Sequence, residues 1–270
     1  MSISTPNLTG VAGTLLAPLA CRAREAARPD ALLRDPHAVE LFAHLGGGMD
    51  SLMGMSALDQ TFTMLRARQF DRFARRFLVA HPAGLVVDIG CGLDTRFDRL
   101  DDGQVAWLGL DLPEVIALRR EFLPEAERCR LLPGSMFDLA WLDVVAQMSR
   151  PVIFLAEGVF PYFSEAEVMP VVAALVGRFP GGELVFDALS SFSIRLHNRT
   201  HPVLQKTGTR LNWGVDNPRG LETWGLRLLT EWGYFDRYEP RLGLANLMRF
   251  IPLLAKANRI LHYRLEGTPP

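Results

Sequence analysis

The chain has few cysteines and no long hydrophobic run, and each scarcity excludes a class of protein. Its 270 residues include three cysteines, at positions 21, 91 and 129, without a Cys-x-x-Cys spacing or a Cys/His cluster. They predict neither a disulfide framework nor a zinc site, so we expect no bound metal and a reduced, cytoplasmic setting. No apolar run approaches the roughly 20 residues that cross a bilayer, so we expect no membrane partner.

Net charge is equally scarce. Lysine and arginine together number 29, against 30 aspartates and glutamates, for a net charge of −1. Binding to nucleic acid relies on a basic field that attracts phosphate groups, so we expect no nucleic-acid partner. The hydrophobic share of 49% and the length instead predict one large domain with a substantial core.

A third glycine is missing from the most informative stretch, residues 85–96. The sequence there, LVVDIGCGLDTR, predicts a buried strand that runs into a turn at Gly90 and Gly92. A strand, a glycine turn and a helix form a mononucleotide-binding unit, whose ligands lie beyond the carboxyl ends of the strands. A dinucleotide site would have G-x-G-x-x-G, but threonine and arginine stand where the third glycine belongs. A purely structural turn is the alternative, in which Asp94 only caps a helix.

Two acids accompany this turn. Asp88 stands two residues before Gly90, where a carboxylate would repel a pyrophosphate but attract a cationic ligand. Asp111 ends a second short apolar strand, roughly 20 residues further on, where an acid commonly binds ribose hydroxyls. The D-x-G-x-G pattern with a ribose acid, but without a pyrophosphate motif, points to S-adenosylmethionine as the cofactor.

Five segments resemble motifs of a known family. Residues 88–96, DIGCGLDTR, resemble the first motif of the leucine carboxyl methyltransferase family, which includes bacterial O-methyltransferases of polyketide and other secondary metabolism. Residues 111–115, DLPEV, with the arginine at 119 resemble its second motif, and residues 156–163, AEGVFPYF, resemble its fourth-strand motif. Residues 34–38 and 66–71 also fit. The resemblance covers nearly the whole chain and indicates the family and the cofactor, but not the substrate.

The resemblance and the alternation of elements predict the same fold. Strands are expected near 85–89, 105–110, 129–132, 152–156, 183–187 and 259–265, and helices at 14–27, from 35 onward, 59–80, 113–122, 140–147, 165–179, 189–204 and 219–230. This alternation predicts an α/β fold with a mostly parallel sheet. The resemblance implies a class I methyltransferase fold, Rossmann-like, with seven strands, helices on both faces, an N-terminal helical cap and a lid insertion.

We expect a single methyltransferase domain over residues 1–270. Its expected segments are a helical cap at 1–84, a cofactor-binding core at 85–187, a substrate lid at 188–235 and closing strands at 236–270. The closing strands are expected to form an antiparallel hairpin, as in other methyltransferases of this class.

The expected cofactor contacts come mainly from the family motifs. They include Asp88, Gly90, Gly92, Asp94, Asp111 and Leu112. Arg66 aligns with a family arginine that holds the methionine carboxylate of the cofactor, a task suited to a bidentate guanidinium. The alternative is a solvated arginine in an arginine-rich helix. Glu157 follows the fourth strand and should face the ligand crevice, although a salt bridge to a cap arginine is the alternative.

The third strand departs from the family pattern. The family often carries Asp-Leu where this chain has Ser135-Met136. A serine hydroxyl, a backbone group or Asp138 would then hold the adenine amino group, and Met136 and Phe137 would pack on the adenine face. Alternatively, these side chains belong to the ordinary core.

Candidates for contact with the methyl acceptor are Tyr162, Arg195, His197 and Trp213. Aromatic residues would hold a flat polyketide or a peptide side chain, and an arginine would hold a carboxylate. A carboxylate acceptor is already anionic and needs no base, whereas a phenol would need one, such as His197 or His201. The lack of an evident acid–base pair favours a carboxylate, and neither route requires a metal.

The expected function is an S-adenosylmethionine-dependent O-methyltransferase that acts on a carboxylate or hydroxyl of a secondary metabolite or peptide. The sequence predicts no oligomeric state. One alternative is a methyltransferase fold that has lost catalysis and serves as a scaffold, against which the intact Asp88, Asp111 and Glu157 argue. The other alternative, a nicotinamide-dependent oxidoreductase, is disfavoured by the missing third glycine.

Overall fold

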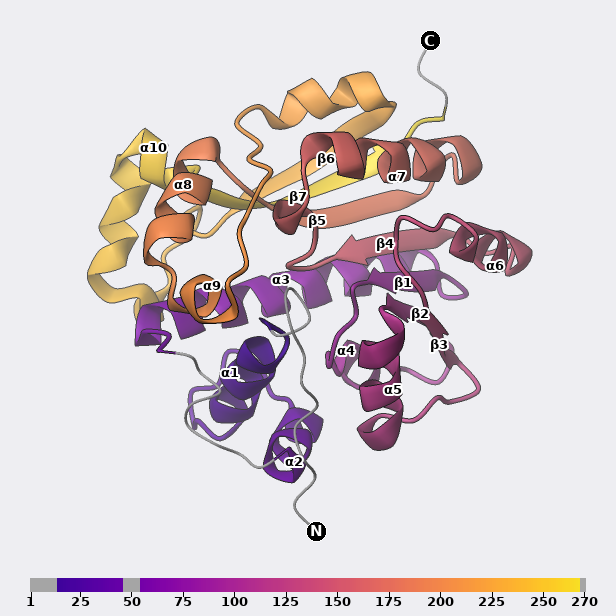
Figure 1. The fold of residues 1–270 in the computed structure, drawn as a ribbon, viewed down its shortest axis with the longest axis horizontal. Coiled ribbons are helices and arrows are strands. Elements are labelled where there is room, and N and C mark those ends of the chain that lie inside the picture. The colour runs from indigo at the N-terminus through magenta and orange to yellow at the C-terminus, as the bar shows by residue number, and fades with distance from the viewer. Residues whose placement is uncertain (1–13, 46–53, 268–270) are drawn as a thin grey trace.

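The computed structural model describes residues 14–45 and 54–267. Its described strands form one seven-stranded sheet in the order β3-β2-β1-β4-β5-β7-β6 (Figure 1). The strands are β1 Leu85–Ile89, β2 Ala106–Asp111, β3 Cys129–Pro133, β4 Val152–Ala156, β5 Glu183–Leu189, β6 Leu226–Gly233 and β7 Asn258–Leu265. The first five strands are parallel, whereas β7 is antiparallel to both β5 and β6. The predicted mostly parallel sheet of seven strands is confirmed, and its last two strands pair antiparallel as expected.

The strand order reverses at β1, which lies between β2 and β4. In open α/β sheets, ligands bind at such a switch point, beyond the carboxyl ends of the strands. The glycine turn follows β1 directly, so the fold places that turn where a ligand crevice is expected.

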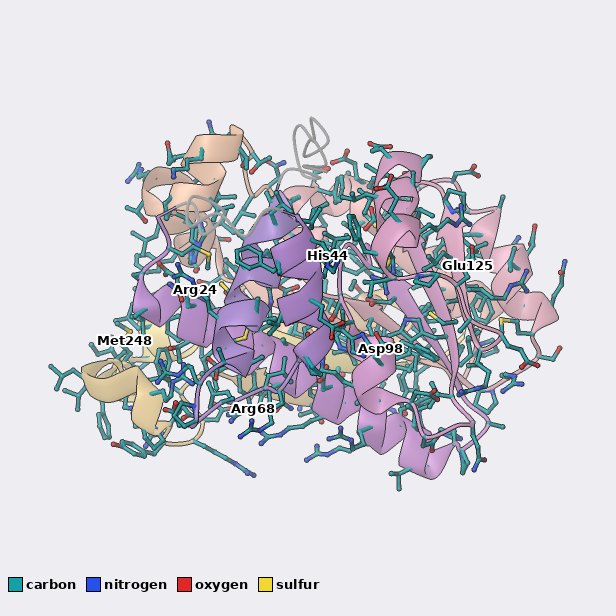
Figure 2. The ribbon with its side chains drawn as sticks, turned by 90° about the horizontal axis from the view of Figure 1, so that it is seen from below. Arg24, His44, Arg68, Asp98, Glu125 and Met248 are labelled. Carbon is teal, nitrogen blue, oxygen red and sulfur yellow. The ribbon has the colours of Figure 1, made fainter. Side chains whose placement is uncertain are left out.

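Helices and short 3₁₀ segments surround the sheet. They are α1 Leu16–Ala26, α2 Pro36–His44, α3 Ala57–Ala80, α4 Arg96–Leu100, α5 Pro113–Phe122, α6 Trp141–Gln147, η3 Phe160–Tyr162, α7 Glu165–Arg178, α8 Ser191–Thr200, α9 Pro202–Thr207, η4 Pro218–Trp224, η5 Pro240–Phe250 and α10 Pro252–Ala255. Seen from below, α1 and α2 cover this side of the molecule (Figure 2). None of the described helices has the length and apolar character needed to cross a bilayer.

Alternating side chains of the strands build two cores. Leu85, Val87 and Ile89 pack with α6, α7 and η4 on one face, whereas Val86 packs with Phe70 of α3 and its neighbours on the other. Because side chains alternate along a strand, Asp88 points to the same face as Val86. The polar end of β1 is thereby directed toward α3.

Two predicted helices differ in the structure. The helix expected over 189–204 is divided into α8 and α9, because His201 before Pro202 is extended (φ −76°, ψ 119°) and proline disfavours helical backbone in the preceding residue. The helix expected over 219–230 is wrong. There, η4 ends at Trp224, Gly225 caps it (φ 81°), and strand β6 follows. Alternate residues from Leu226 onward are more buried, as a strand beside β7 requires.

The last segment boundary also differs. Strand β6 lies within 188–235, the segment predicted as the lid, and η5 and α10 precede β7 within 236–270. The closing strands therefore come from both segments. The division of the chain into four functional segments otherwise stays a prediction.

Candidate active site

A cavity of about 350 Å³ lies at the carboxyl ends of the parallel strands. Its wall contains the glycine turn after β1, the ends of β2, β4 and β5, and parts of α1, α3, α8 and α9. All ten predicted cofactor contacts line it: Arg66, Asp88, Gly90, Gly92, Asp94, Asp111, Leu112, Ser135, Met136 and Glu157. The structure thus brings together residues that are up to 91 positions apart, such as Arg66 and Glu157. Their cofactor-binding roles stay predictions.

The glycine turn depends on the absence of side chains. Gly90 has φ 70°, and a Cβ there would lie 2.4 Å from a methyl carbon of Val159. Gly92 has φ 48°, which other residues rarely adopt. Its N–H donates to one carboxylate oxygen of Asp111 at 2.7 Å, and the N–H of Leu112 donates to the other at 2.7 Å.

These two bonds fix the plane of the Asp111 carboxylate at the cavity wall. Burial raises the pKa of Asp111, and the hydrogen bonds from Gly92 and Leu112 oppose that effect. Each oxygen of an ionised carboxylate has two acceptor positions. Asp111 can therefore accept further hydrogen bonds from a ligand while its orientation is held by the backbone.

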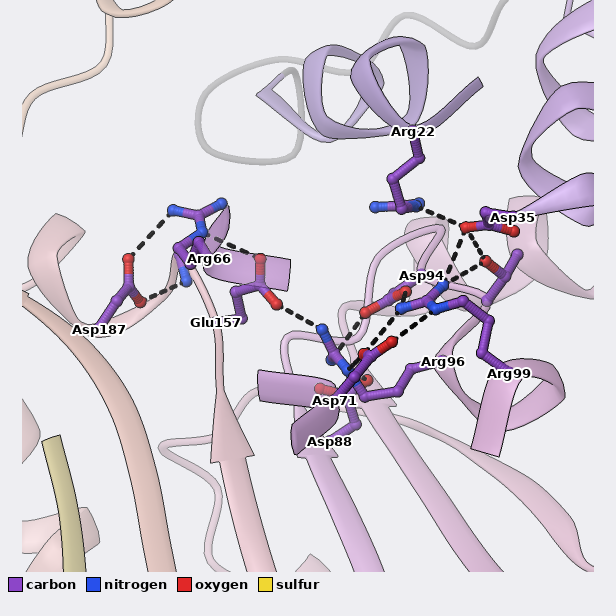
Figure 3. Close-up of polar contacts among 12 residues, drawn as sticks. Arg22, Asp35, Arg66, Asp71, Asp88, Asp94, Arg96, Arg99, Glu157 and Asp187 are labelled. Carbon is purple, nitrogen blue, oxygen red and sulfur yellow. Dashed lines mark hydrogen bonds and ion pairs between the residues drawn. The ribbon is translucent and has the colours of Figure 1, made fainter. Parts of the chain in front are cut away.

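Arg96 is the centre of a buried charge network (Figure 3). Its guanidinium is 1% exposed, and its Nε lies 2.7 Å from Asp71 while a terminal nitrogen lies 2.7 Å from Asp94. Its other terminal nitrogen donates to Glu157. The nitrogen beside Asp94 also lies 3.8 Å from a carboxylate oxygen of Asp88. Arg96 therefore joins α3, β1, the glycine turn and the end of β4.

The network extends to the N-terminal cap. Arg99 donates to Asp71 and Asp35, at 2.9 Å in each case. Arg22 of α1 lies 3.1 Å from Asp35 and donates to the carbonyl of Leu93 at 2.8 Å. The cap is thus attached to the glycine turn by buried ion pairs as well as by apolar packing.

Arg66 lies at the opposite end of the network. Its Nε donates to Glu157 at 2.9 Å, and one terminal nitrogen donates to Asp187 at 3.1 Å. The side chain is 21% exposed, so the alternative of a solvated arginine is wrong. The alternative for Glu157, a salt bridge to a cap arginine, is present in the structure, and Glu157 also lines the cavity.

Acidic groups outnumber arginines in this network. It contains Arg22, Arg66, Arg96 and Arg99 together with Asp35, Asp71, Asp88, Asp94, Glu157 and Asp187. Burial raises the pKa of Asp88 to about 7. Burial also opposes ionisation of Asp94, but Arg96 and Arg99 hold its pKa well below the ordinary value. The side of the cavity formed by this network, which we call the floor, is therefore suited to a cationic ligand.

Two of the four candidates for contact with the acceptor line the cavity, and two do not. Tyr162 and His197 line the cavity. Arg195 does not: it is exposed, because residues two apart on a helix face different directions. Trp213 is also wrong as a contact. It is 5% exposed in the core and stacks on Phe186 at 5.9 Å and on Trp224 at 5.7 Å.

The two histidines near the acceptor candidates are stacked. The rings of His197 and His201 are 5.5 Å apart, and both line the cavity. Nδ1 of His197 lies 2.8 Å from the carbonyl oxygen of Ser193. Because a carbonyl only accepts hydrogen bonds, Nδ1 carries the proton, and Nε2 of the neutral ring is an acceptor. Burial and the neighbouring His197 lower the pKa of His201.

Asp187 and Arg96 are among the residues of this site that the sequence does not single out, as are Asp35, Asp71 and Arg99. Asp187 lies near the carboxyl end of β5, as Glu157 follows β4, and strand alternation with Val185 directs it toward α3. That alternation was a usable signal. Arg96 lies in the first motif with Asp88 and Asp94, but its other acidic neighbours, Asp71 and Glu157, come from distant segments, which local patterns do not reveal.

Comparisons with known proteins agree with the geometry. The model of the family described as leucine carboxyl methyltransferase matches residues 16–176. The chain is 35% identical to the tetracenomycin polyketide synthesis O-methyltransferase TcmP of Streptomyces glaucescens, over 96% of this chain and 98% of that protein. It is 33% identical to the S-adenosyl-L-methionine-dependent methyltransferase dpfgK of Gibberella zeae, over 80% of this chain and 79% of the relative.

Solved structures show the same fold. A putative methyltransferase from Thermobifida fusca matches with a TM-score of 0.59 and 16% identity, over 96% of each chain. A DUF574 family protein from Streptomyces avermitilis matches with a TM-score of 0.60 and 13% identity, over 93% of this chain and 97% of the other. At these identities the likeness concerns the fold alone.

Proposed function

The chain belongs to the leucine carboxyl methyltransferase family, and on that premise we propose how its cavity carries out methyl transfer. The protein is an S-adenosylmethionine-dependent O-methyltransferase. All ten predicted cofactor contacts line one cavity at the switch point of the sheet. This observation is the main support for our assignment of the site.

The cofactor site is proposed to use three kinds of contact. The oriented carboxylate of Asp111 accepts the ribose hydroxyls. Leu112, Ser135 and Met136 flank the adenine. Arg66, two of whose three nitrogens are held by Glu157 and Asp187, offers the remaining nitrogen to the methionine carboxylate.

The excess of buried acids supports the same orientation. S-adenosylmethionine supplies an electrophilic methyl group on a sulfonium and also carries an ammonium group. We place these positive charges near Asp88, whose carboxylate lies 3.8 Å from the nearest nitrogen of Arg96, because a buried acid without a close cation is costly. The chain's own task is to align the acceptor with the methyl group and to exclude water.

The methyl acceptor is proposed to be a carboxylate or hydroxyl of a secondary metabolite or peptide. Tyr162 and His197 line one side of the cavity together with the apolar side chains of Val203, Leu204 and Leu211. We call this side the acceptor wall, and its apolar character suits a flat, largely apolar molecule. The relative TcmP, named for polyketide synthesis, supports a polyketide acceptor. We place the enzyme in the cytoplasm, because its three cysteines are free and buried.

Calorimetric titration with S-adenosylhomocysteine tests the cofactor site. We expect micromolar binding by the wild type and binding at least tenfold weaker, about 1.4 kcal/mol, in Asp111→Ala. Glu121→Ala, which removes an exposed acid from α5, is the matched control and should bind as the wild type does. A folded wild type that binds no S-adenosylhomocysteine would contradict the proposed site.

A further inference from the structure

A second surface, on the side of the molecule formed by α3 and η5, combines exposed apolar side chains with arginines. Six of the thirteen exposed large apolar side chains of the described chain fall within 16 residues: Tyr238, Leu244, Leu247, Phe250, Ile251 and Leu253. Leu244 is 85% exposed and Phe250 is 76% exposed. Such a concentration is typical of an interaction site rather than of scattered surface hydrophobics.

The arginines of α3 lie next to this segment. Arg72, Arg75 and Arg76 are exposed on one face of the helix, and Arg68 of the same helix pairs with Glu239 at 2.9 Å. The pKa of Arg72 is lowered by burial and by the nearby guanidinium groups of Arg68 and Arg237. Figure 2 shows Arg68 and Met248 on the same flank of the molecule.

Few acids balance these charges. Arg237, Arg249 and Lys256 add three cations from the apolar segment and its flanks. In the described part of the chain, Glu239 and Glu25 are already paired with Arg68 and Arg241, and the exposed Asp236 beside Arg237 offsets one further charge. This flank is therefore basic although the net charge of the whole chain is −1.

We propose that the surface made by residues 237–256 and the exposed arginines of α3 docks on an anionic lipid membrane. Large apolar side chains that project outward enter the interface between headgroups and acyl chains, while arginines around them bind acidic headgroups. Docking of this kind is peripheral and needs no membrane-spanning segment. It departs from the expectation that the chain has no membrane partner, which rests only on the absence of a spanning run.

The charges argue against a second copy of the chain as the occupant. A two-fold contact would bring the same patch of each copy together, so two surfaces of like, positive charge would be juxtaposed. Juxtaposed like charges oppose association. The 85% exposure of Leu244 also means that this side chain projects from the surface and does not line a groove for a partner's helix.

Sedimentation with lipid vesicles tests the proposal on the full chain. We expect the wild type to bind vesicles of equal phosphatidylcholine and phosphatidylglycerol at least tenfold more strongly than pure phosphatidylcholine, and to bind less at 0.5 M salt. The double variant Leu244→Glu with Phe250→Glu should lose at least tenfold in vesicle binding. Met169→Glu, at an exposed apolar position on α7, is the matched control and should bind normally.

S-adenosylhomocysteine titration of the same variants separates this proposal from the cofactor site, because both variants should keep wild-type cofactor affinity. A wild type that binds the cofactor product but neither vesicle overturns the membrane proposal. So does an equal loss of vesicle binding in Met169→Glu. A dimer that the double variant dissociates, without vesicle binding, would assign the surface to a second copy. Retention on polyglutamate without vesicle binding would assign it to an acidic protein.

Discussion

The floor of the cavity consists mainly of charged side chains, whereas its acceptor wall consists mainly of aromatic and apolar ones. The floor contains ion pairs that connect Arg66, Arg96 and Arg99 with buried carboxylates. The acceptor wall, formed by η3, α8, α9 and the segment after them, contains Tyr162, the stacked histidines and apolar side chains. The floor is therefore held by strong directional contacts, and the wall mainly by packing.

This difference separates the two ligands of the reaction. A cofactor common to all reactions of the family requires fixed charges at fixed positions, which rigid strand ends provide. The acceptor instead meets a wall of short helices and loops after β5, segments of a kind that commonly carry binding residues and vary more than the elements they connect. Mutations in the floor should therefore affect folding and cofactor binding, whereas mutations in the wall should affect the acceptor step.

The largest effect is expected at Arg96. Arg96→Met removes the one cation that contacts Asp71, Asp94 and Glu157 together. Arg99 still pairs with Asp71 and Asp94, and Arg66 with Glu157, but Asp88 loses the arginine beside it and the buried acids share one cation fewer. Removal of one partner from a buried ion pair costs about 3–5 kcal/mol. Urea unfolding should show a loss of that size, with a smaller loss in Arg96→Lys. Arg120→Met, which removes an arginine in an exposed pair with Glu125, is the control and should change the free energy of unfolding by less than about 1 kcal/mol.

A smaller effect, on cofactor affinity, is expected at Arg66. Arg66→Lys keeps a positive charge but loses the fork that joins Glu157, Asp187 and the proposed methionine carboxylate. We expect KM for S-adenosylmethionine to rise about tenfold with little change in kcat, because lysine does not reproduce bidentate binding. Steady-state kinetics measure both constants. A fall in kcat at unchanged KM would assign Arg66 to the acceptor step instead.

The pH dependence of cofactor binding sharpens the same comparison. Burial raises the pKa of Asp88 to about 7, so this carboxyl becomes anionic as the pH rises from 6 to 8. Affinity for the cationic S-adenosylmethionine should increase up to about tenfold over that range, and less for the uncharged thioether S-adenosylhomocysteine. Calorimetry at pH 6, 7 and 8 measures both ligands. Asp88→Asn should abolish the difference in pH dependence, and a wild type without any difference would contradict the role of Asp88.

The same titration has the opposite sign for folding. The pKa of Asp88 is higher in the folded chain than its ordinary value, so the folded state favours the protonated carboxyl. The contribution of Asp88 to stability is present below the ordinary pKa and is lost as the pH rises through about 7. Asp94 behaves in the reverse way, because its arginine partners lower its pKa. Its contribution is present above its ordinary pKa and is lost in strong acid.

Much of the floor could be predicted from the sequence, because its signals are local. The apolar run of β1, the two glycines and Asp111 lie within 27 residues. The apolar run indicates a buried strand, the glycines indicate the turn after it, and Asp111 indicates the end of the next strand. The parts that were missed depend on three-dimensional arrangement. Two of the four carboxylates around Arg96, Asp88 and Asp94, share its motif, but Asp71 and Glu157 come from distant segments, and no short pattern records that these meet it.

The acceptor wall was predicted less well for a physical reason. Aromatic and charged residues after β5 occur in both core and lid, so composition did not distinguish Trp213, which is in the core, from Tyr162, which lines the cavity. Helical register separates Arg195 from His197, but only once the exact bounds of α8 are known. Residues 226–233 differ from the prediction of a helix because apolar and polar side chains alternate only weakly along strand β6.

The smallest effect is expected at His197. His197→Gln removes the acceptor nitrogen Nε2 from the wall but leaves the floor unchanged, so the affinity for S-adenosylhomocysteine should stay within a factor of two. If the acceptor is the carboxylate that the sequence favours, no base is required, and kcat should fall less than about tenfold. General-base catalysis contributes about 10²–10⁴-fold, so a loss of that size would instead indicate a hydroxyl acceptor. Asn198→Gln, on the same helix, is no suitable control because Asn198 bonds Leu211. Arg195→Gln serves better, since Arg195 is exposed on the other side of α8 and should leave both constants unchanged.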